Sequence, residues 1–440
     1  MAKDKFLVQG LGGKKKLNGT ITVGGAKNAA LKVMASSILF KDTLVAHNVP
    51  DIEDVKRMSG LLIELGCTVK RNNHATYSFL CGNNTKTDLS SEISKRMRSS
   101  IVLSGPLLSR FGEVSFPHPG GCVIGVRSID FFIEGFQKMG ARVNIHGKAN
   151  KKRYVIKAPP GKLKGATIFL KTPSVTATET LMMAGVLAAG TTVIQNAALE
   201  PEIKDLADFL NRSGATIMGA GTTTITVRGG ALLSSRGKPY TTMPDRIETG
   251  SFVILGALCA RRLLIKNCNP EHATALLDAL VSSGVSIKIG KTSIAIINNK
   301  QNKKQFKSVN IKTHEYPGFP TDLQAPMTVF LTQAKGEALV FETIFEGRLN
   351  YTESLGDMGA DITPMDPHRV LVKGPMSLRG RKLQSPDLRA GLAFIIAAIV
   401  ARGNSIIHNV YNIDRGYERI DERLRGIGVY IKRINGNGEI

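Results

Sequence analysis

Hydrophobic and polar positions follow one pattern that recurs six times along the chain. In each copy a long apolar stretch, such as residues 178–189 or 388–401, precedes a short β-rich phrase. An amphipathic stretch such as 203–210 comes next. The apolar stretches are long enough for buried helices, whereas the amphipathic ones need only one covered face. Each unit is therefore predicted to contain a buried helix, a strand, a loop, an amphipathic helix and two more strands.

The β-rich phrase marks the repeat because it often ends in Asn. Clear copies span residues 42–48, 190–196, 262–267 and 403–409, and weaker copies begin at Gly112 and Gly336. A glycine opens the next strand in every unit: Gly66, Gly140, Gly214, Gly284, Gly359 and Gly428. A period of roughly 70 to 75 residues is typical of an array built from one supersecondary unit.

Six units in 440 residues divide naturally into two domains of three units each. The polar, turn-rich stretch 229–239 suggests a crossover between them. We expect one domain at residues 1–20 and 239–440, which holds both termini, and an inserted domain at 21–238 that carries a loop at 119–128. This α/β arrangement predicts a large cleft where the domains meet, a common place for a ligand.

Composition and charge narrow the class of protein. Apolar residues at 42% and charged residues at 21% disfavour disordered, collagen-like and coiled-coil proteins. The longest apolar run, 390–401, is shorter than the roughly 18 residues of a membrane span, so we expect a cytosolic protein. The net charge of +24 would suit nucleic acid, an anionic membrane or anionic small molecules. A nucleic-acid-binding module is thus one alternative, although aromatic residues for base stacking are scarce at 6%.

The five cysteines form no CxxC pair and leave one unpaired, so we expect reduced thiols and no zinc cluster. No histidine spacing matches a metal motif. Cys122 differs from the other four because it lies among three glycines in the loop 119–127, which ends in Arg127. A free cysteine is usually a small buried hydrophobe, but a thiol beside arginine can be reactive. The loop is therefore a candidate mobile lid.

Helix start signals precede all six buried helices. They lie at residues 24–28, 94–98, 172–175, 245–248, 319–322 and 385–389. Exposed N–H groups at helix starts suit anions, and Lys27, Arg98 and Arg389 add full charges. Two glycines before Lys27 let the backbone and the ammonium group approach one anion closely, with Asn28 beside it.

A plainer interpretation exists for these residues. Ser174, Asp322 and Asp387 could be ordinary N-caps, worth about 1 kcal/mol each. Arg348 and Arg415, at corresponding places in the fifth and sixth units, suit bidentate capture of carboxylate or phosphate, but surface arginines are commonly only solubilising charges.

Six strings, taken together and in order, resemble the UDP-N-acetylglucosamine 1-carboxyvinyltransferase family. They span residues 25–31, 119–122, 244–250, 319–322, 387–389 and 408–419, and the likeness runs nearly end to end. The resemblance implies an inside-out α/β barrel pair, with helices buried and sheets outside. It implies transfer of the enolpyruvyl group of phosphoenolpyruvate to the 3′-hydroxyl of UDP-N-acetylglucosamine with release of phosphate, the first committed step of peptidoglycan synthesis. It implies no metal and no organic cofactor.

The resemblance also assigns roles to residues at matching positions. Asp322 would take the hydroxyl proton, and Cys122 would supply a proton to the methylene carbon, form a covalent phosphoenolpyruvate adduct and be alkylated by fosfomycin. Contacts with phosphoenolpyruvate are implied for Lys27, Asn28, Arg127, Arg348, Arg389 and Arg415, of which Lys27 and Arg415 also count as catalytic. Contacts with the sugar nucleotide are implied for Asn28, Arg98, Arg127, Ser128, Ile129, Asp130, Phe131, Thr172, Ser174, Val175, Asp322 and Ile344.

Four positions depart from the family pattern. Ser128 stands where Pro is common, Lys171 where an acid is expected, Thr176 where Gly is expected and Leu199 where Arg is expected. Lid stiffness and the details of uridine recognition can therefore differ from the family. The sister transferase that acts on shikimate 3-phosphate is the alternative enzyme, but it lacks a cysteine in a glycine-rich lid, so Cys122 argues against it.

Overall fold

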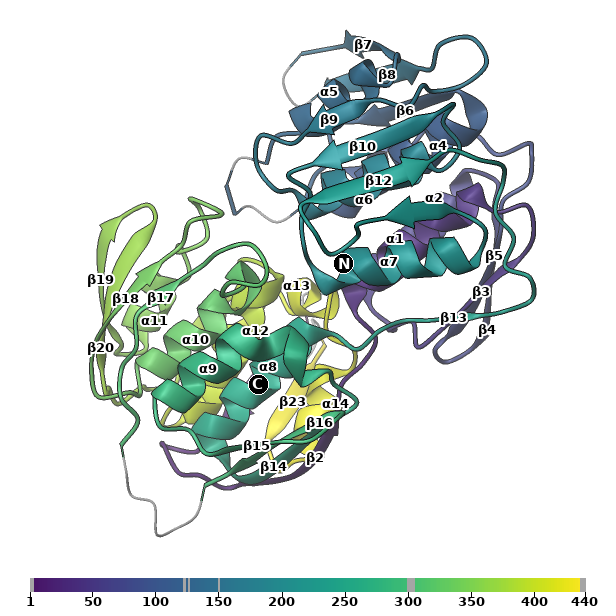
Figure 1. Ribbon diagram of the computed structural model, residues 1–440. Helices are drawn as coiled ribbons and strands as arrows, with labels where there is room; N and C mark the ends of the chain where they lie inside the picture. The colour runs from purple at the N-terminus through teal and green to yellow at the C-terminus, as the bar shows by residue number, and fades with distance from the viewer. Residues whose placement is uncertain (1–3, 122–123, 126, 149–150, 299–304, 436–440) are drawn as a thin grey trace. The chain divides into compact units, whose positions relative to one another are not determined.

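The chain forms two compact units in the computed structural model, which describes residues 4–121, 124–125, 127–148, 151–298 and 305–435 (Figure 1). The first unit comprises Met1–Gly24, Cys122–Val126 and Pro244–Ile440, and the second comprises Gly25–Gly121 and Arg127–Met243. The stretch 229–239 thus lies within the second unit, and the chain returns to the first unit at Met243–Pro244.

The first unit packs three buried helices against three four-stranded sheets (Figure 1). The central helices are α8 (Arg246–Cys259), α10 (Gln324–Leu331) and α12 (Leu388–Val400), and the outer ones are α9 (Thr274–Ser282), α11 (Thr352–Asp357), α13 (Tyr411–Asp414) and α14 (Ile420–Arg425). The sheets have the orders β21 (Lys382–Gln384), β22 (Asn404–His408), β1 (Lys5–Gln9), β23 (Ile431–Ile434); β15 (Ile287–Ile289), β16 (Ser293–Ile297), β14 (Ala260–Lys266), β2 (Leu17–Thr22); and β17 (Ile311–Lys312), β18 (Gly336–Phe341), β20 (Arg369–Gly374), β19 (Asp361–Asp366). Every residue of α12 is buried, as its unbroken apolar sequence requires.

The second unit repeats this plan with sheets of four, four and three strands. Its central helices are α1 (Lys27–Ser36), α4 (Ser104–Phe111), which follows the 3₁₀ helix η2 (Arg98–Leu103), and α6 (Val175–Gly185); α2 (Glu53–Glu64), α5 (Asp130–Lys138) and α7 (Pro201–Arg212) are amphipathic. The sheets have the orders β11 (Thr216–Met218), β12 (Thr224–Arg228), β10 (Thr191–Gln195), β9 (Thr167–Phe169); β13 (Tyr240–Thr241), β3 (Leu44–His47), β5 (Thr76–Leu80), β4 (Thr68–Asn73); and β6 (Glu113–Pro117), β8 (Arg153–Lys157), β7 (Arg142–His146). Strands such as β10 and β12 alternate buried and exposed residues, so one face covers the helices and the other meets solvent.

The sixfold repeat has a physical basis in backbone conformation. The six glycines predicted to open strands all have φ between +88° and +110°, a region that side chains other than hydrogen rarely tolerate. The Asn residues that end the clear β-rich phrases also adopt the left-handed region, with φ of 54° to 56°. The side chain of Asn48 donates to Thr242 O at 2.8 Å, and Asn196 and Asn267 donate to Leu170 O and Val23 O in the same way. These three Asn side chains thus bind the backbone directly after the edge strands β13, β9 and β2.

The expectation of reduced thiols is wrong for two cysteines. Cys67 and Cys81 form a disulfide with their Cα atoms 4.4 Å apart. They flank the hairpin of β4 and β5, whose register places Thr68 opposite Leu80 and so brings the two cysteines together. Cys259 and Cys268 are free and buried. The pairing depends on strand register, which the cysteine spacing alone does not reveal.

Candidate anion-binding sites at the helix starts

Two buried arginines hold the Asp322 carboxylate in the first unit. Arg348 Nη2 lies 2.7 Å from Asp322 Oδ1, and Arg389 Nε and Nη2 lie 2.9 and 2.8 Å from Oδ2. The arginine side chains are only 5% and 4% exposed, whereas Asp322 is 27% exposed. Both oxygens of Asp322 therefore bond to side chains, and its carboxylate is the part of this cluster that solvent reaches.

Further polar groups orient the two guanidinium groups. Arg348 Nη1 donates to Thr321 Oγ1 at 3.0 Å, and the Thr321 hydroxyl donates to Glu342 at 2.8 Å. Burial by itself would lower the pKa of Arg348, but the negative charges of Asp322, Asp387 and Glu342 outweigh it and raise the pKa. This arginine is therefore charged and fixed in direction.

Arg389 is fixed in a similar way at the start of α12. Its Nη1 donates to Tyr417 Oη at 2.9 Å, and burial of its guanidinium is outweighed by Asp322 and other negative groups, which raise the pKa of Arg389 well above its usual value. Asp387 caps α12 by accepting from Arg389 N and Ala390 N. Arg415 is buried at the end of α13. Arg348 and Arg389 thus meet at Asp322, beside the starts of α10 and α12.

The plainer capping interpretation holds for some acidic and hydroxyl residues but not for Asp322. Asp387 and Ser174 accept hydrogen bonds from the first turns of α12 and α6. Asp322 instead lies inside the short 3₁₀ helix η5 (Thr321–Leu323), and its carboxylate accepts from the side chains of Arg348 and Arg389. Its position serves the arginine cluster and not helix capping.

In the second unit, Lys27 opens α1 and lies beside a buried carboxylate. Lys27 Nζ is 3.6 Å from Asp54 Oδ2, which belongs to α2. The preceding Ala26 offers no side-chain acceptor to the first turn of α1. A Cβ on Gly25 would lie 1.8 Å from Asn48 O, so only glycine allows this approach of the chain to the helix start. Backbone N–H groups and an ammonium group are thus concentrated at one end of α1.

Arg98 opens η2 and holds the chain on the far side of the glycine loop. Its Nη2 donates to Arg127 O at 2.5 Å and to Ser128 O at 2.9 Å. Burial, together with the charge of Arg127, lowers the pKa of Arg98 to about 10. Because burial and the charge of Arg127 disfavour the charged guanidinium, a bound anion would stabilise it.

The loop residues after Arg127 lead directly into α5. Ser128 Oγ accepts from Asp130 N at 2.9 Å and also bonds to the Asp130 carboxylate, which gives this segment a local anchor in place of the missing Pro. Ile129 is buried and Phe131 is half-buried. Cys122 lies outside the described residues.

The start of α6 carries the residues expected to contact a nucleotide. Ser174 accepts from Ala177 N at 3.3 Å, Val175 begins the helix, and Thr172 is exposed just before it. Lys171, one of the departures from the family pattern, pairs with Glu134 at 3.1 Å on the surface. The Lys171 charge is therefore partly engaged by another element of the same unit.

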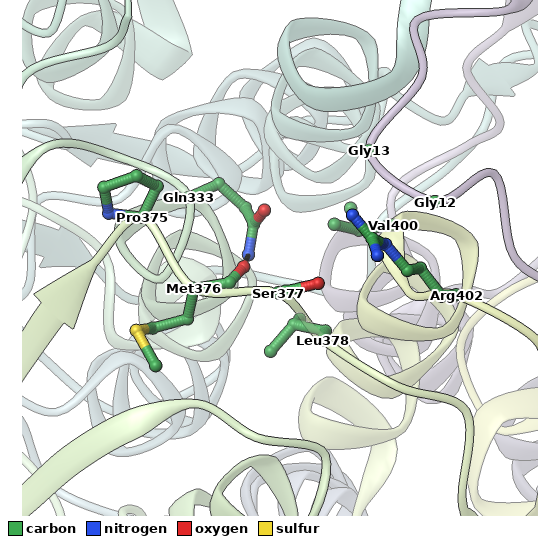
Figure 2. Close-up of a pocket in the computed structure, with 9 residues that line it drawn as sticks. All are labelled: Gly12, Gly13, Gln333, Pro375, Met376, Ser377, Leu378, Val400 and Arg402. Carbon is green, nitrogen blue, oxygen red and sulfur yellow. Dashed lines mark hydrogen bonds between the residues drawn. The ribbon is translucent and has the colours of Figure 1, made fainter.

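A separate hollow of about 270 Å³ lies in the first unit near the C-terminal ends of α10 and α12. Figure 2 shows Gln333 and Met376 on one side of it and Val400 and Arg402 on the other. The 13 residues of α12 span about 20 Å, so this hollow is roughly one helix length from Arg389. Gly13 N donates to Val400 O there, which identifies a capped helix end.

The chain resembles known proteins over nearly its whole length. The family model described as EPSP synthase (3-phosphoshikimate 1-carboxyvinyltransferase) matches residues 11–424. The UDP-N-acetylglucosamine 1-carboxyvinyltransferase of Koribacter versatilis is 41% identical over 436 residues, which cover 98% of this chain and 96% of that relative. The chain belongs to this transferase family. A relative of the same name from Acidobacterium capsulatum is 42% identical over 437 residues, with 98% and 96% covered.

Solved structures of lower identity share the fold of this transferase family. The enolpyruvyl transferase NikO from Streptomyces tendae has a TM-score of 0.85 at 21% identity, with 99% of this chain and 100% of NikO covered. EPSP synthase from Acinetobacter baumannii has a TM-score of 0.73 at 17% identity, with 98% and 100% covered. The predicted α/β fold of enolpyruvyl transferase type is confirmed.

For this transferase, the structure groups some of the expected site residues within each unit. Asp322, Arg348 and Arg389 form one bonded cluster, and Arg98, Arg127 and Ser128 form another. Ile344 is half-buried, and its N–H donates to Glu342 at 2.9 Å, next to the first cluster.

Sequence reasoning missed several residues that support these clusters. They are Asp54, Thr321, Glu342 and Tyr417. Tyr417 lies inside the string 408–419 that carries the family resemblance, which was the available signal. Asp54 has no such signal, because its contact with Lys27 depends on how α1 and α2 pack.

Proposed function

We propose that this chain transfers the enolpyruvyl group of phosphoenolpyruvate to the 3′-hydroxyl of UDP-N-acetylglucosamine and releases phosphate. Membership of the transferase family supports the reaction, and the observation that carries the assignment of roles is the Asp322 carboxylate between two buried, oriented arginines. Both substrates are anions, which fits the cationic helix starts of the two units.

Asp322 is proposed as the group that receives the hydroxyl proton. The two guanidinium groups surround an ionised carboxylate with donors and keep its orientation fixed, while its 27% exposure leaves it within reach of a substrate. The hydroxyl oxygen then forms a bond to C2 of phosphoenolpyruvate as Asp322 takes the proton.

Cys122 is proposed as the acid that gives a proton to C3 in the same addition. The product is a tetrahedral ketal in which C2 carries the sugar oxygen and the phosphate oxygen. In the elimination, C3 loses a proton to the Cys122 thiolate, the C2–C3 double bond returns and the bond from C2 to the phosphate oxygen breaks, which releases phosphate. Positive groups at Lys27, Arg127 and Arg415 would stabilise the negative charge on phosphate and carboxylate throughout.

Arg348 and Arg389 are proposed to bind the carboxylate of phosphoenolpyruvate as well as Asp322. A guanidinium group has five donors, so each arginine can serve a second acceptor beside Asp322. On the nucleotide side, Arg98 and the start of α6 at Ser174 are proposed to contact UDP-N-acetylglucosamine, with Asn28, Asp130 and Ile344. The lowered pKa of Arg98, caused by burial and by Arg127, supports an anionic partner there.

The cellular setting follows from the chemistry. We place the reaction in the cytoplasm at the first committed step of peptidoglycan synthesis, with small-molecule substrates and no nucleic acid. The part of the chain that the structure describes contains no helix with the length and hydropathy of a membrane span.

Phosphate release tests the proposed function. Phosphoenolpyruvate alone is expected to give no phosphate, addition of UDP-N-acetylglucosamine is expected to start release, and shikimate 3-phosphate is expected to be inert. A coupled phosphate assay on the purified chain measures all three conditions. Release with shikimate 3-phosphate in place of the sugar nucleotide would assign the chain to the sister activity, and release that needs neither acceptor would refute a transferase.

A Cys122→Ser variant is expected to escape inactivation by fosfomycin and to lose turnover by about a hundredfold, because a hydroxyl is a poorer acid and nucleophile than a thiol. Cys268→Ser is the matched control, since burial raises the pKa of Cys268 to about 11 and makes that thiol unreactive. Residual activity after incubation with fosfomycin, together with intact mass, measures the outcome. Full inactivation of the Cys122 variant would show that another group is the target.

A further inference from the structure

The end of β2 is held at three successive residues just before α1. Arg423 Nη2 donates to Thr22 O at 2.6 Å, and Asn267 Nδ2 donates to Val23 O at 2.8 Å. Gly24 N donates to Glu248 Oε2 at 2.8 Å, and Gly24 O accepts from Asp245 N at 3.0 Å. All of these groups belong to the first unit.

Glu248 and Arg423 also bond to each other at two points. Arg423 Nη1 lies 2.5 Å from Glu248 Oε1, and its Nη2 lies 3.1 Å from Oε2. The side chain of Arg423 is 20% exposed and that of Glu248 is 6% exposed. The guanidinium group of Arg423 lies 5.0 Å from the centre of the Phe252 ring. Two-point pairing and stacking restrict the direction of the guanidinium, so the pair acts as a rigid clamp on residues 22–24.

The clamp lies very close in sequence to Lys27. Lys27 is the third residue after Gly24, and three residues span at most about 11 Å. Gly25 between them tolerates no side chain, and Ala26 N donates to Met243 O at 2.7 Å. A short connection with so little freedom transmits a displacement of Gly24 to the start of α1.

We propose that Glu248 and Arg423 are positioning residues for Lys27 and Asn28, an inference that rests on the proposed function. Arg423 donates to the carbonyl of Thr22, and Glu248 accepts from the N–H of Gly24, so both side chains hold the segment that leads into α1. Such an ion pair adds little to stability compared with apolar replacements, so its main effect is on where the chain leaves the first unit. Loss of one partner also leaves the other charge buried without its counter-ion and so lowers stability, which is why the positioning role is judged by the KM for phosphoenolpyruvate, with thermal unfolding measured beside it.

The test uses Arg423→Met, Arg423→Lys and Glu248→Gln, with Arg369→Met as the matched control. Arg369 forms an exposed pair with Asp366 at 2.7 Å in the same unit. Initial rates of phosphate release are measured with saturating UDP-N-acetylglucosamine and varied phosphoenolpyruvate, beside thermal unfolding of each variant. Arg423→Met and Glu248→Gln are expected to raise KM for phosphoenolpyruvate about tenfold with kcat within about threefold of the wild type. Arg423→Lys is expected to recover most of the loss, and the control is expected to match the wild type.

The outcomes separate this inference from the proposed function. An unchanged KM in both Arg423→Met and Glu248→Gln, with normal wild-type turnover, overturns the positioning role alone. A loss that lowers kcat and unfolding temperature together, without raising KM, assigns the pair a merely structural role and overturns it too. If the wild type gives no turnover at all, the proposed function fails and this inference fails with it. Glu248→Gln keeps the size and shape of the side chain, so it provides the measurement if Arg423→Met does not fold.

Discussion

Replacement of Asp322 by asparagine is expected to lower kcat by about a thousandfold, the largest effect of any single change considered. Asn keeps the shape of the side chain and one acceptor oxygen for the arginines, but it cannot take up the hydroxyl proton. Loss of a positioned general base typically lowers the rate by about 10² to 10⁴. The Kd for UDP-N-acetylglucosamine is expected to change by less than about threefold, since one contact of many is altered.

The control for this variant is Asp366→Asn. Asp366 also pairs with an arginine in the first unit, at 2.7 Å, but it lies on β19 and the pair is exposed. Steady-state phosphate release and calorimetric titration with the nucleotide separate turnover from binding. A kcat within about threefold of the wild type in Asp322→Asn would exclude the base role and leave Asp322 as an organiser of Arg348 and Arg389.

Features set by neighbouring residues could be predicted from the sequence. The left-handed Asn residues and glycines recur because each unit needs the same turns, and the caps at Ser174 and Asp387 are local hydrogen bonds. Five of the six buried helices begin at or beside the predicted start signals for the same reason, and at the sixth signal the 3₁₀ helix η2 begins and leads into α4. These turns, caps and helix starts can be predicted without knowing which repeat units pack against each other.

Features that join distant segments could not be predicted. Glu248 and Arg423 lie 175 positions apart in the sequence, and the residues around each of them do not indicate that the two side chains will pair. Asp322 illustrates the same limit, because its local sequence suggests a helix cap while the fold gives it to arginines from two other segments. The disulfide between Cys67 and Cys81 depends on strand register in the same way.

The interior of the second unit contains another ion pair that joins distant segments, and breaking this pair is expected to lower the stability of the chain strongly. Lys32 of α1 lies 3.1 Å from Glu179 of α6, and the side chains are 5% and 0% exposed. Burial raises the pKa of Glu179 to about 7, Lys32 counters this shift, and Glu202 and Glu200 add to it. Lys32 is thus the cation that offsets the cost of burying the Glu179 carboxylate in this core.

Replacing Lys32 by methionine is expected to lower the free energy of unfolding by about 3 kcal/mol at pH 7.5, because it leaves a buried carboxyl without its cation. The double variant Lys32→Met with Glu179→Leu is expected to recover most of that loss, since an apolar pair has no charge to desolvate. Lys204→Met is the control, because Lys204 pairs with Asp208 on an exposed face of the same unit. Urea unfolding of the four proteins measures the differences.

The pH dependence of Lys32→Met decides whether an uncompensated carboxyl is the cause. The pKa of Glu179 is about 7 in the folded chain against an ordinary value of 4.5, and without Lys32 it should rise further. A carboxyl whose pKa is raised by folding binds its proton more tightly in the folded state. It therefore destabilises the folded chain least below pH 4.5, and the destabilisation grows as the pH rises through the pKa of the folded state. The deficit of Lys32→Met should therefore shrink between pH 7.5 and pH 5.5, because the variant can protonate Glu179 at little cost in acid. A deficit of equal size at both pH values would point instead to lost packing of the lysine side chain, and the role of Lys32 as an internal counter-ion would be wrong.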